Sequence, residues 1–241
     1  MAQTLKFGNG TWATKKGSTL AFNDEDGNYK PLPFTTTRAT SATRVNKEGL
    51  IEVVENDRPR IDYTDSAKGA LLLEPERINL VTYSEDFNNP NWIKSRSSIT
   101  STSTINPSGS VSSSYMYDDN TNGNHKIYSG TFSVTSGQNQ SVSIFAKVGT
   151  LSTFRIRFAR FDEADIGFSE VIFDLENGTT SSVEGTIIDY GNGWYRCIVT
   201  DAVNYTGLAR VFLYLKDGVY TGTGTDYIEI WGAQTETNSS Y

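Results

Sequence analysis

Seven side chains between residues 92 and 214 are of the types that sugar binding requires. Aromatic rings stack on pyranose faces, while imidazole and guanidinium groups hydrogen-bond to hydroxyls. The candidate glycan-binding residues are Trp92, Tyr117, His125, Tyr128, Arg155, Arg157 and Tyr214. A simpler interpretation exists for several of them. Trp92 would pack in a core, and Arg155 and Arg157 would form a solvated strand face because they alternate with apolar residues.

Side chains for acid–base or nucleophilic catalysis are scarce. His125 is the only histidine, and it lies in a turn-like segment that favours a solvated loop position over a catalytic one. Asp162, Glu163 and Asp165 form the densest acidic cluster of the second half, which is typical of a solvated turn. No serine nucleophile elbow, zinc signature or phosphate-binding loop is present. We therefore predict no catalytic residues and no enzyme activity.

Two further acidic features have simple explanations. Glu74 and Glu76 flank Pro75, where a salt bridge with Arg60 or Arg77 is favoured over acid catalysis. The acidic run before Gly27 superficially resembles a calcium loop, but Phe22 stands where the first carboxylate ligand would be required. This run is interpreted as a hairpin turn, and no metal site or cofactor is predicted.

Bulk properties narrow the class of protein. The chain has 241 residues with 13 Tyr, 12 Phe and only 2 Met, and its formal net charge is −7. Acidic chains repel phosphate backbones, so nucleic acid is not an expected partner. Cys197 is the only cysteine, which excludes an intramolecular disulfide and is interpreted as a buried free thiol. No apolar run could span a bilayer, and the first residues lack a signal-peptide pattern, so we expect folding in a cytoplasm and no membrane insertion.

Alternating patterns and turn residues predict strands over most of residues 80–241. Val142, Ile144 and Ala146 fall on one face of such a strand, as expected for a half-buried sheet. The expected strands cover 114–117, 126–134, 140–148, 154–161, 171–174, 185–189, 194–201, 211–214 and 227–234. Their lengths and spacing predict an all-β fold with a jelly-roll β-sandwich over residues 80–241. Trp194 and Trp231 lie within apolar strands and are expected to pack in its interior.

The residues before the sandwich predict two smaller β-rich parts. Residues 1–34 are expected to form a hairpin arm, with Asp26-Gly27 at its turn. This arm has too few large apolar residues to bury a core alone, so it requires a partner surface. Residues 35–79 are expected to contain short strands, including the apolar run Leu71–Leu73, and to form an assembly segment with the arm.

A string of short motifs runs in a fixed order from residue 38 to the end. Its first part reads Arg38-x-x-x-Ala42-Thr43-Arg44-Val45, Gly49-Leu50-Ile51, Pro59-Arg60-Ile61-Asp62-Tyr63, Gly69-x-Leu71-Leu72-Leu73-Glu74-x-x-Arg77-x-Asn79-Leu80, Tyr83-Ser84-x-x-Phe87 and Trp92. Its second part reads Phe173-Asp174-Leu175-x-x-Gly178, Gly193-Trp194-Tyr195-Arg196 and Trp231-Gly232-Ala233-Gln234-x-Glu236. This order resembles a family of fibre proteins of tailed-bacteriophage virions, in which the first part of the string precedes a jelly-roll domain similar to carbohydrate-binding modules.

The resemblance implies a function and partners. It implies a structural virion component, a head or tail fibre or capsid decoration protein, that oligomerises through residues 1–79 and displays a lectin-like sandwich. The partners would be its own copies (a homotrimer, otherwise a dimer), capsid, portal or tail proteins, and host surface polysaccharide. The protein would be located in the virion after assembly in the bacterial cytoplasm. A structural calcium ion would fit such a module, with Asp86 and Asp226 as conceivable ligands that no spacing enforces. The alternative is a polysaccharide-degrading fibre enzyme.

Overall fold

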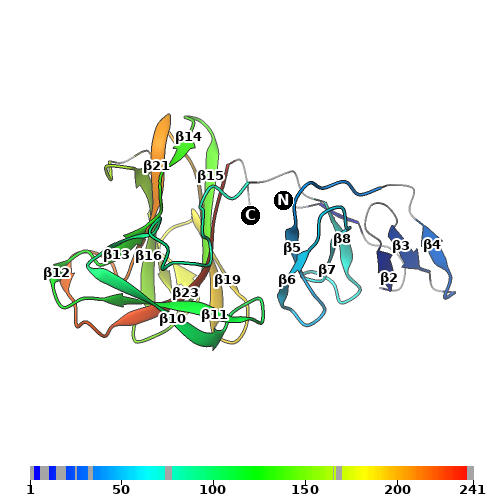
Figure 1. The fold of residues 1–241 in the computed structure, drawn as a ribbon, viewed down its shortest axis with the longest axis horizontal. Helices are drawn as coiled ribbons and strands as arrows, with labels where there is room; N and C mark the ends of the chain where they lie inside the picture. Colours follow the sequence, from blue (N-terminus) through cyan, green and yellow to red (C-terminus); the bar gives the residue numbers. More distant parts are fainter. Residues whose placement is uncertain are drawn as a thin grey trace. The chain divides into compact units, whose positions relative to one another are not determined.

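The computed structural model describes residues 3–5, 11–14, 20–24, 26–31, 35–73, 78–164, 166 and 170–237. Every regular element within these residues is a β-strand, which confirms the all-β prediction (Figure 1). Among them, no helix exists that could cross a membrane. The chain divides into two compact units, an N-terminal unit of Met1–Glu76 with Pro107–Gly109 and a sandwich unit of Arg77–Asn106 with Ser110–Tyr241.

Short antiparallel strands build the N-terminal unit. One sheet has the order β1 (Gln3–Leu5), β8 (Ala70–Leu73), β7 (Ile61–Asp62). A second contains β2 (Trp12–Thr14), β3 (Leu20–Asn23) and β4 (Tyr29–Pro31), and β5 (Ala42–Val45) pairs with β6 (Ile51–Val54). The turn predicted between β3 and β4 is confirmed: Gly27 has a φ of 85°, and the Asp24 N–H donates to Asn28 O over 2.9 Å.

The N-terminal unit has a small core that joins the expected arm to the expected assembly segment. Ile61 and Leu71 are buried, with Trp12 and Tyr63 packed against them. The Trp12 indole Nε1–H also donates to Lys68 O over 2.9 Å. Because β1 pairs with β8 as well, part of the partner surface that the arm requires belongs to the same chain.

Two antiparallel sheets form the sandwich unit. The six-stranded sheet has the order β10 (Ser97–Ile105), β11 (Val111–Asp118), β23 (Tyr227–Thr237), β15 (Asn139–Lys147), β20 (Trp194–Ala202), β19 (Gly185–Asp189). The seven-stranded sheet has the order β18 (Thr179–Thr180), β17 (Val171–Asp174), β16 (Thr153–Arg160), β21 (Gly207–Tyr214), β13 (Lys126–Tyr128), β9 (Ile93–Ser95), with β14 (Phe132–Val134) also on β21. A two-stranded ribbon pairs β12 (Asn122–Gly123) with β22 (Tyr220–Thr221).

The order of strands along the chain confirms the jelly-roll sandwich. From β11 onward the chain passes to β13 and β14 in the other sheet, returns to β15, and then crosses again to β16 and β17. It continues through β19 and β20, crosses to β21 and finishes in β23. Alternate crossing of this kind places the apolar face of each strand between the two sheets.

The core between the sheets follows from the alternation that the sequence shows. Val142, Ile144 and Ala146 of β15 all belong to it. Trp194 and Trp231 are buried, but the prediction that they pack in this core is wrong, because they alternate with its members on β20 and β23. Trp231 packs against Phe145 with ring centroids 5.3 Å apart, and the Trp194 indole N–H donates to Ile105 O over 2.9 Å. Cys197 is a buried free cysteine, and burial raises the pKa of its thiol well above the usual value.

One expected strand, residues 126–134, is interrupted in the structure. β13 ends at Tyr128 and β14 begins at Phe132. Between them the Ser129 hydroxyl accepts a hydrogen bond from the Val211 N–H over 3.0 Å and donates to Gly130 O over 2.8 Å. A side chain therefore takes part in backbone pairing at the break in the strand.

Candidate functional site

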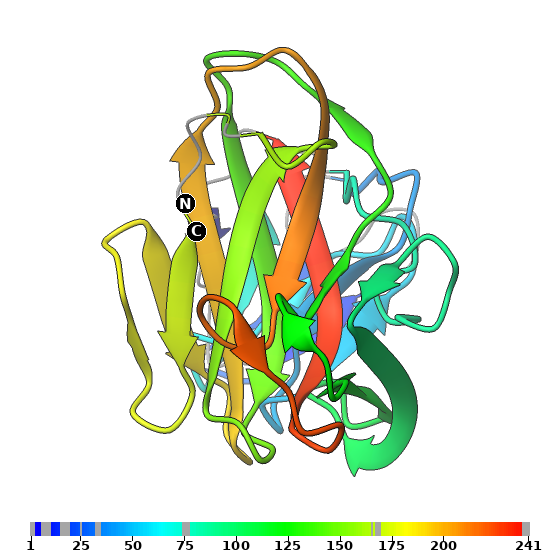
Figure 2. The same ribbon diagram turned by 90° about the vertical axis from the view of Figure 1, so that its left-hand side faces the viewer.

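Four of the seven predicted sugar-binding residues lie on the outer surface of the seven-stranded sheet. On β16, Phe154, Ile156 and Phe158 point into the core, so Arg155 and Arg157 point outward. The same alternation on β21 buries Val211 and Leu213 in the core and turns residues 212 and 214 outward. Figure 2 shows β16 and β21 side by side in the sheet that faces the viewer.

The register of three strands brings these outward residues together. Arg155 of β16 lies opposite Tyr214 of β21, and Arg157 lies opposite Phe212. On the other side of β21, Lys126 of β13 lies opposite Tyr214 and Tyr128 lies opposite Phe212. With the next outward residue of β21, they form what we call the basic aromatic face: Lys126, Tyr128, Arg155, Arg157, Arg210, Phe212 and Tyr214.

Cations lie over the aromatic rings of this face. The Arg155 guanidinium carbon is 4.1 Å from the Tyr214 ring centroid, and Lys126 Nζ is 5.5 Å from the centroids of both Phe212 and Tyr214. The Arg210 guanidinium lies 5.1 Å from the Tyr128 ring. These distances are within the range of cation–π attraction. The aromatic rings therefore form a floor, and the cationic groups form a layer above it.

Carboxylates from neighbouring segments pair with that cationic layer. Glu163 accepts from Lys126 Nζ at 2.6 Å with both carboxylate oxygens. Arg155 Nη1 donates to Asp217 over 3.1 Å and to Glu170 over 3.3 Å, and Arg157 Nε lies 3.8 Å from Glu170. The expectation that Arg155 is simply solvated is therefore wrong, because ion pairs and the Tyr214 ring enclose it.

Electrostatic effects of the face are visible in Tyr214. Burial raises the pKa of its phenol, and the hydrogen bond with Arg157 opposes that increase. The buried phenol therefore stays neutral at physiological pH. At 2% exposure the Tyr214 side chain forms part of the floor under Arg155, and its own ring cannot stack on a sugar.

The structure contradicts two of the predicted site residues. Trp92 is only 1% exposed, packs against Phe87 with ring centroids 4.9 Å apart, and donates its indole N–H to Tyr83 O over 3.0 Å. Its simpler interpretation as a core residue is confirmed. Neither face of its ring can stack on a sugar.

His125 is likewise 1% exposed, so the predicted solvated loop position is wrong. Its Nδ1 is 2.6 Å from Arg96 O and its Nε2 is 3.3 Å from Tyr220 O. Its ring packs on Tyr220 with centroids 4.4 Å apart. His125 joins three segments from the inside and offers no nitrogen to an external ligand.

Tyr117 lies away from the basic aromatic face, on the six-stranded sheet. With Tyr115 on the same strand and Tyr227 on β23 it forms a cluster of half-buried rings, with centroid distances of 4.7–5.9 Å. Burial, followed by the neighbouring Tyr227 and Tyr115, raises the pKa of the Tyr117 phenol. This tyrosine cluster is a second aromatic surface of the sandwich unit.

Some members of the face did not emerge from the sequence pattern. Lys126, Arg210 and Phe212 were not selected, although they occupy alternate positions on strands that also carry Tyr128 and Tyr214. Listing the outward residue at every second position of the predicted strands 126–134 and 211–214 would have included Lys126 and Phe212. Arg210 lies just before the predicted strand 211–214, because β21 begins earlier, at Gly207. The carboxylate partners could not be found this way, because loop residues have no such period.

The remaining acidic predictions have mixed outcomes. Asp162 pairs with Arg160 at 2.9 Å, and Asp165, Glu74 and Glu76 lie outside the described residues. Asp226 pairs with Lys216 at 3.3 Å. In the part of the chain that the structure describes, no three His, Cys, Asp or Glu side chains gather as a metal site would require, and Asp86 has no such neighbours.

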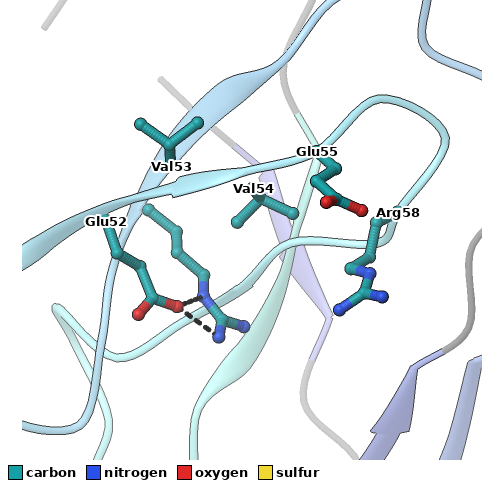
Figure 3. A pocket seen from close by; sticks show the side chains of 6 residues that line it. Glu52, Val53, Val54, Glu55 and Arg58 are labelled. Carbon is teal, nitrogen blue, oxygen red and sulfur yellow. Dashed lines mark hydrogen bonds and ion pairs between the residues drawn. The ribbon is translucent and has the colours of Figure 1, made fainter.

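A small hollow lies within the N-terminal unit. It has a volume of about 240 Å³. Figure 3 shows Glu52, Val53, Val54, Glu55 and Arg58 along it. Ligand pockets are usually about 300–1,000 Å³. The Glu52 side chain is also engaged, in an ion pair with Arg44, so the hollow is a weaker candidate than the basic aromatic face.

Comparisons with known proteins give distant structural neighbours. No family model matches the chain, and no curated protein matches it. The enzymatically active domain of tailspike protein 4 from bacteriophage CBA120 aligns with a TM-score of 0.45 and 16% identity over 66% of this chain. That alignment spans about a fifth, 21%, of the tailspike chain.

Two further neighbours are carbohydrate-binding modules. The N-terminal CBM22-1–CBM22-2 tandem domain of Paenibacillus barcinonensis Xyn10C aligns with a TM-score of 0.40 and 15% identity, over 92% of this chain and 74% of that one. A carbohydrate-binding module of the β-sandwich superfamily aligns with a TM-score of 0.37 and 8% identity, over 93% of this chain and 96% of that one.

Proposed function

We propose that the sandwich unit binds glycan through the basic aromatic face. The observation that carries this proposal is the meeting of Tyr128, Arg155, Arg157 and Tyr214 on one sheet surface. Their side-chain types alone predict sugar binding, and the strand register brings them together.

The chemistry of the face suits polyhydroxylated ligands. Guanidinium groups are rigid, multiple donors, and Asp217 and Glu170 add acceptors beside them. Tyr128 is half-buried at the edge of the floor and presents a ring for stacking. Binding sites of this kind combine apolar contact with a few well-placed polar groups.

Binding is favoured over hydrolysis. A glycosidase requires one protonated carboxyl group and one carboxylate on either side of the scissile bond. Glu163, Glu170 and Asp217 each accept hydrogen bonds from Lys126 or Arg155. We propose a non-enzymatic protein, and a reducing-sugar assay on host polysaccharide tests the alternative of a depolymerase.

We also propose that the protein is a virion component of head or tail fibre type, on the resemblance of its motif string. In this proposal the N-terminal unit anchors the chain to capsid, portal or tail proteins and associates as a trimer, otherwise a dimer. Copies of the sandwich unit then act together on host surface glycan. Multivalent display would convert weak single-site binding into firm attachment.

A glycan array carrying neutral and acidic polysaccharides tests the binding proposal. We expect the unmodified protein to bind and Arg157→Gln to weaken binding about tenfold, since charge-assisted hydrogen bonds contribute roughly 1.5–3 kcal/mol. Tyr117→Ala, on the opposite sheet, is the control and should leave affinity unchanged. Loss of binding in Tyr117→Ala alone would move the site to the tyrosine cluster, and absence of any signal would reject glycan binding.

A further inference from the structure

We infer that the ligand of the basic aromatic face is an acidic sugar, with a carboxylate that takes the place of a protein carboxylate. This inference rests on the proposed glycan-binding function and assigns the class of glycan. The candidates are chains containing uronic acids or other sugar carboxylates.

The charge of the face has the opposite sign to that of the whole chain. The chain has a formal net charge of −7. On the face, the cations Lys126, Arg155, Arg157 and Arg210 outnumber the paired carboxylates Glu163, Glu170 and Asp217. A local excess of positive charge on an acidic protein attracts anionic groups to this surface in particular.

The ion pairs of the face join buried cations to exposed carboxylates. The side chains of Lys126 and Arg155 are each 10% exposed, whereas those of Glu163, Glu170 and Asp217 are 43%, 48% and 60% exposed. The cations are fixed over the aromatic floor, while Glu163 and Asp217 come from connecting segments beyond strand ends. Exposed ion-pair partners contribute little free energy, so a ligand carboxylate can replace one at low cost.

Arg210 adds a positive charge that the protein does not neutralise: among the described residues, no carboxylate forms an ion pair with it. The Nε–H groups of Arg210 and Arg155 lack an acceptor among these residues, but both nitrogens are covered from solvent, so a ligand would meet the outer guanidinium nitrogens. Guanidinium groups bind carboxylates in a two-bond fork, a geometry that neutral sugar hydroxyls do not reproduce.

The test compares acidic polysaccharides with neutral versions of the same chains. Immobilised polygalacturonate, alginate and hyaluronate are each paired with a preparation in which the carboxyl groups have been reduced to hydroxymethyl groups. We expect binding to at least one acidic polymer, at least tenfold weaker binding after reduction, and a decrease in affinity as salt concentration rises. Arg210→Gln should weaken binding to the acidic form about fivefold.

Asp217→Asn is the most decisive variant, because it is expected to raise the affinity for the acidic polymer whereas Arg210→Gln lowers it. Removing this carboxylate frees Arg155 for the ligand, so affinity for the acidic polymer should increase about threefold. The control Lys30→Gln removes one positive charge from an exposed ion pair with Asp24 in the N-terminal unit and should change nothing.

The outcomes separate the inference from the proposed function. Binding that survives carboxyl reduction, or that occurs only on neutral members of the wider array, overturns the acidic-sugar inference and leaves glycan binding standing. Loss of affinity in Asp217→Asn would overturn the claim that a ligand carboxylate takes the place of a protein carboxylate on Arg155. No binding to any polymer would overturn both.

Discussion

Arg155 and Arg157 are two residues apart on one strand, yet their surroundings give them different roles. The Arg155 side chain is 10% exposed and is held by Asp217, Glu170 and the Tyr214 ring. Arg157 is 27% exposed and donates to the backbone oxygen of Glu163 over 2.9 Å. Removing Arg155 would delete a nearly buried side chain that packs on Tyr214, so its effect on binding would be mixed with loss of stability. Arg157 and Arg210 are therefore the better probes of ligand contact.

His125 gives a stability prediction at the same scale. Replacing it with Leu keeps a side chain of similar size but removes the ring nitrogens that face Arg96 O, Tyr220 O and the Asp119 N–H. We expect His125→Leu to lower the free energy of unfolding by about 1–3 kcal/mol. Urea denaturation followed by tryptophan fluorescence measures this, with the exposed Ser98→Ala as the control. An unchanged midpoint would show that the histidine hydrogen bonds contribute nothing net.

The local sequence around His125 could not reveal its burial. Besides Asp119, six residues away, its partners lie 29 and 95 residues away in the chain. The loop that follows β22 also approaches closely: a Cβ atom on Gly222 would collide with Asp119 O and lie 2.8 Å from His125 Cε1. Glycine and asparagine near the histidine indicated a turn, but Asn122–Gly123 is strand β12, and it pairs with β22 from the far end of the sandwich.

At the scale of elements, the N-terminal unit has only a small core, and hydrogen bonds from Arg38 connect several of its segments. Its guanidinium donates to the backbone oxygens of Thr40, Val54, Glu55 and Arg58, and its own N–H donates to Asp57 Oδ1. This gives a physical reason for the first residue of the motif string. One guanidinium satisfies carbonyl groups from three stretches of chain.

Arg38→Lys should therefore loosen the N-terminal unit selectively. Lysine keeps the charge but cannot donate in several fixed directions, so we expect a loss of at least about 2 kcal/mol in local stability. Native-state hydrogen exchange should show faster exchange at the Asp57 amide, which donates to Arg38 O, while amides of the sandwich core stay protected. Arg58→Lys is the matched control, because Arg58 is exposed. Equal effects of the two variants would contradict the role given to Arg38.

The strand β10 shows where pattern reading fails. Its sequence, Ser97–Ile105, consists of Ser and Thr with two isoleucines, and it was not predicted as a strand. It nevertheless pairs with β11 from Ser97↔Asp118 to Ile105↔Val111, with a register shift after Thr102. An edge strand buries few side chains, so backbone pairing with a stronger neighbour is sufficient to form it.

At the scale of the whole molecule, the two units differ in what they can bury. The sandwich unit has an extensive core, whereas Ile61 and Leu71 are the residues of the buried cluster in the N-terminal unit. In the described part of that unit, Val53 remains 70% exposed. A unit with so small a core gains stability from association, which agrees with the proposed assembly role.

Light scattering on the full chain and on a chain beginning at Asn79 tests that role. Asn79 must be retained because its side chain donates to Ala233 O and accepts from Thr235 N. We expect the full chain to be trimeric, otherwise dimeric, and the shorter chain to be a folded monomer. A monomeric full chain would remove self-association, and an oligomeric shorter chain would assign assembly to the sandwich.

The sequence alone determined the all-β class, the sandwich, the turn at Gly27 and the inward or outward direction of side chains on most strands. These features depend on the alternation of side chains along a strand, which has a period of two residues, and on turn residues such as glycine, and both are local in the sequence. Only the tertiary structure decided which outward residues meet. Arg155 reaches Tyr214 through strand register and Asp217 through a loop 62 positions away. Trp92 and His125 are excluded from the candidate site because they are buried, and burial depends on chain segments that are distant in sequence.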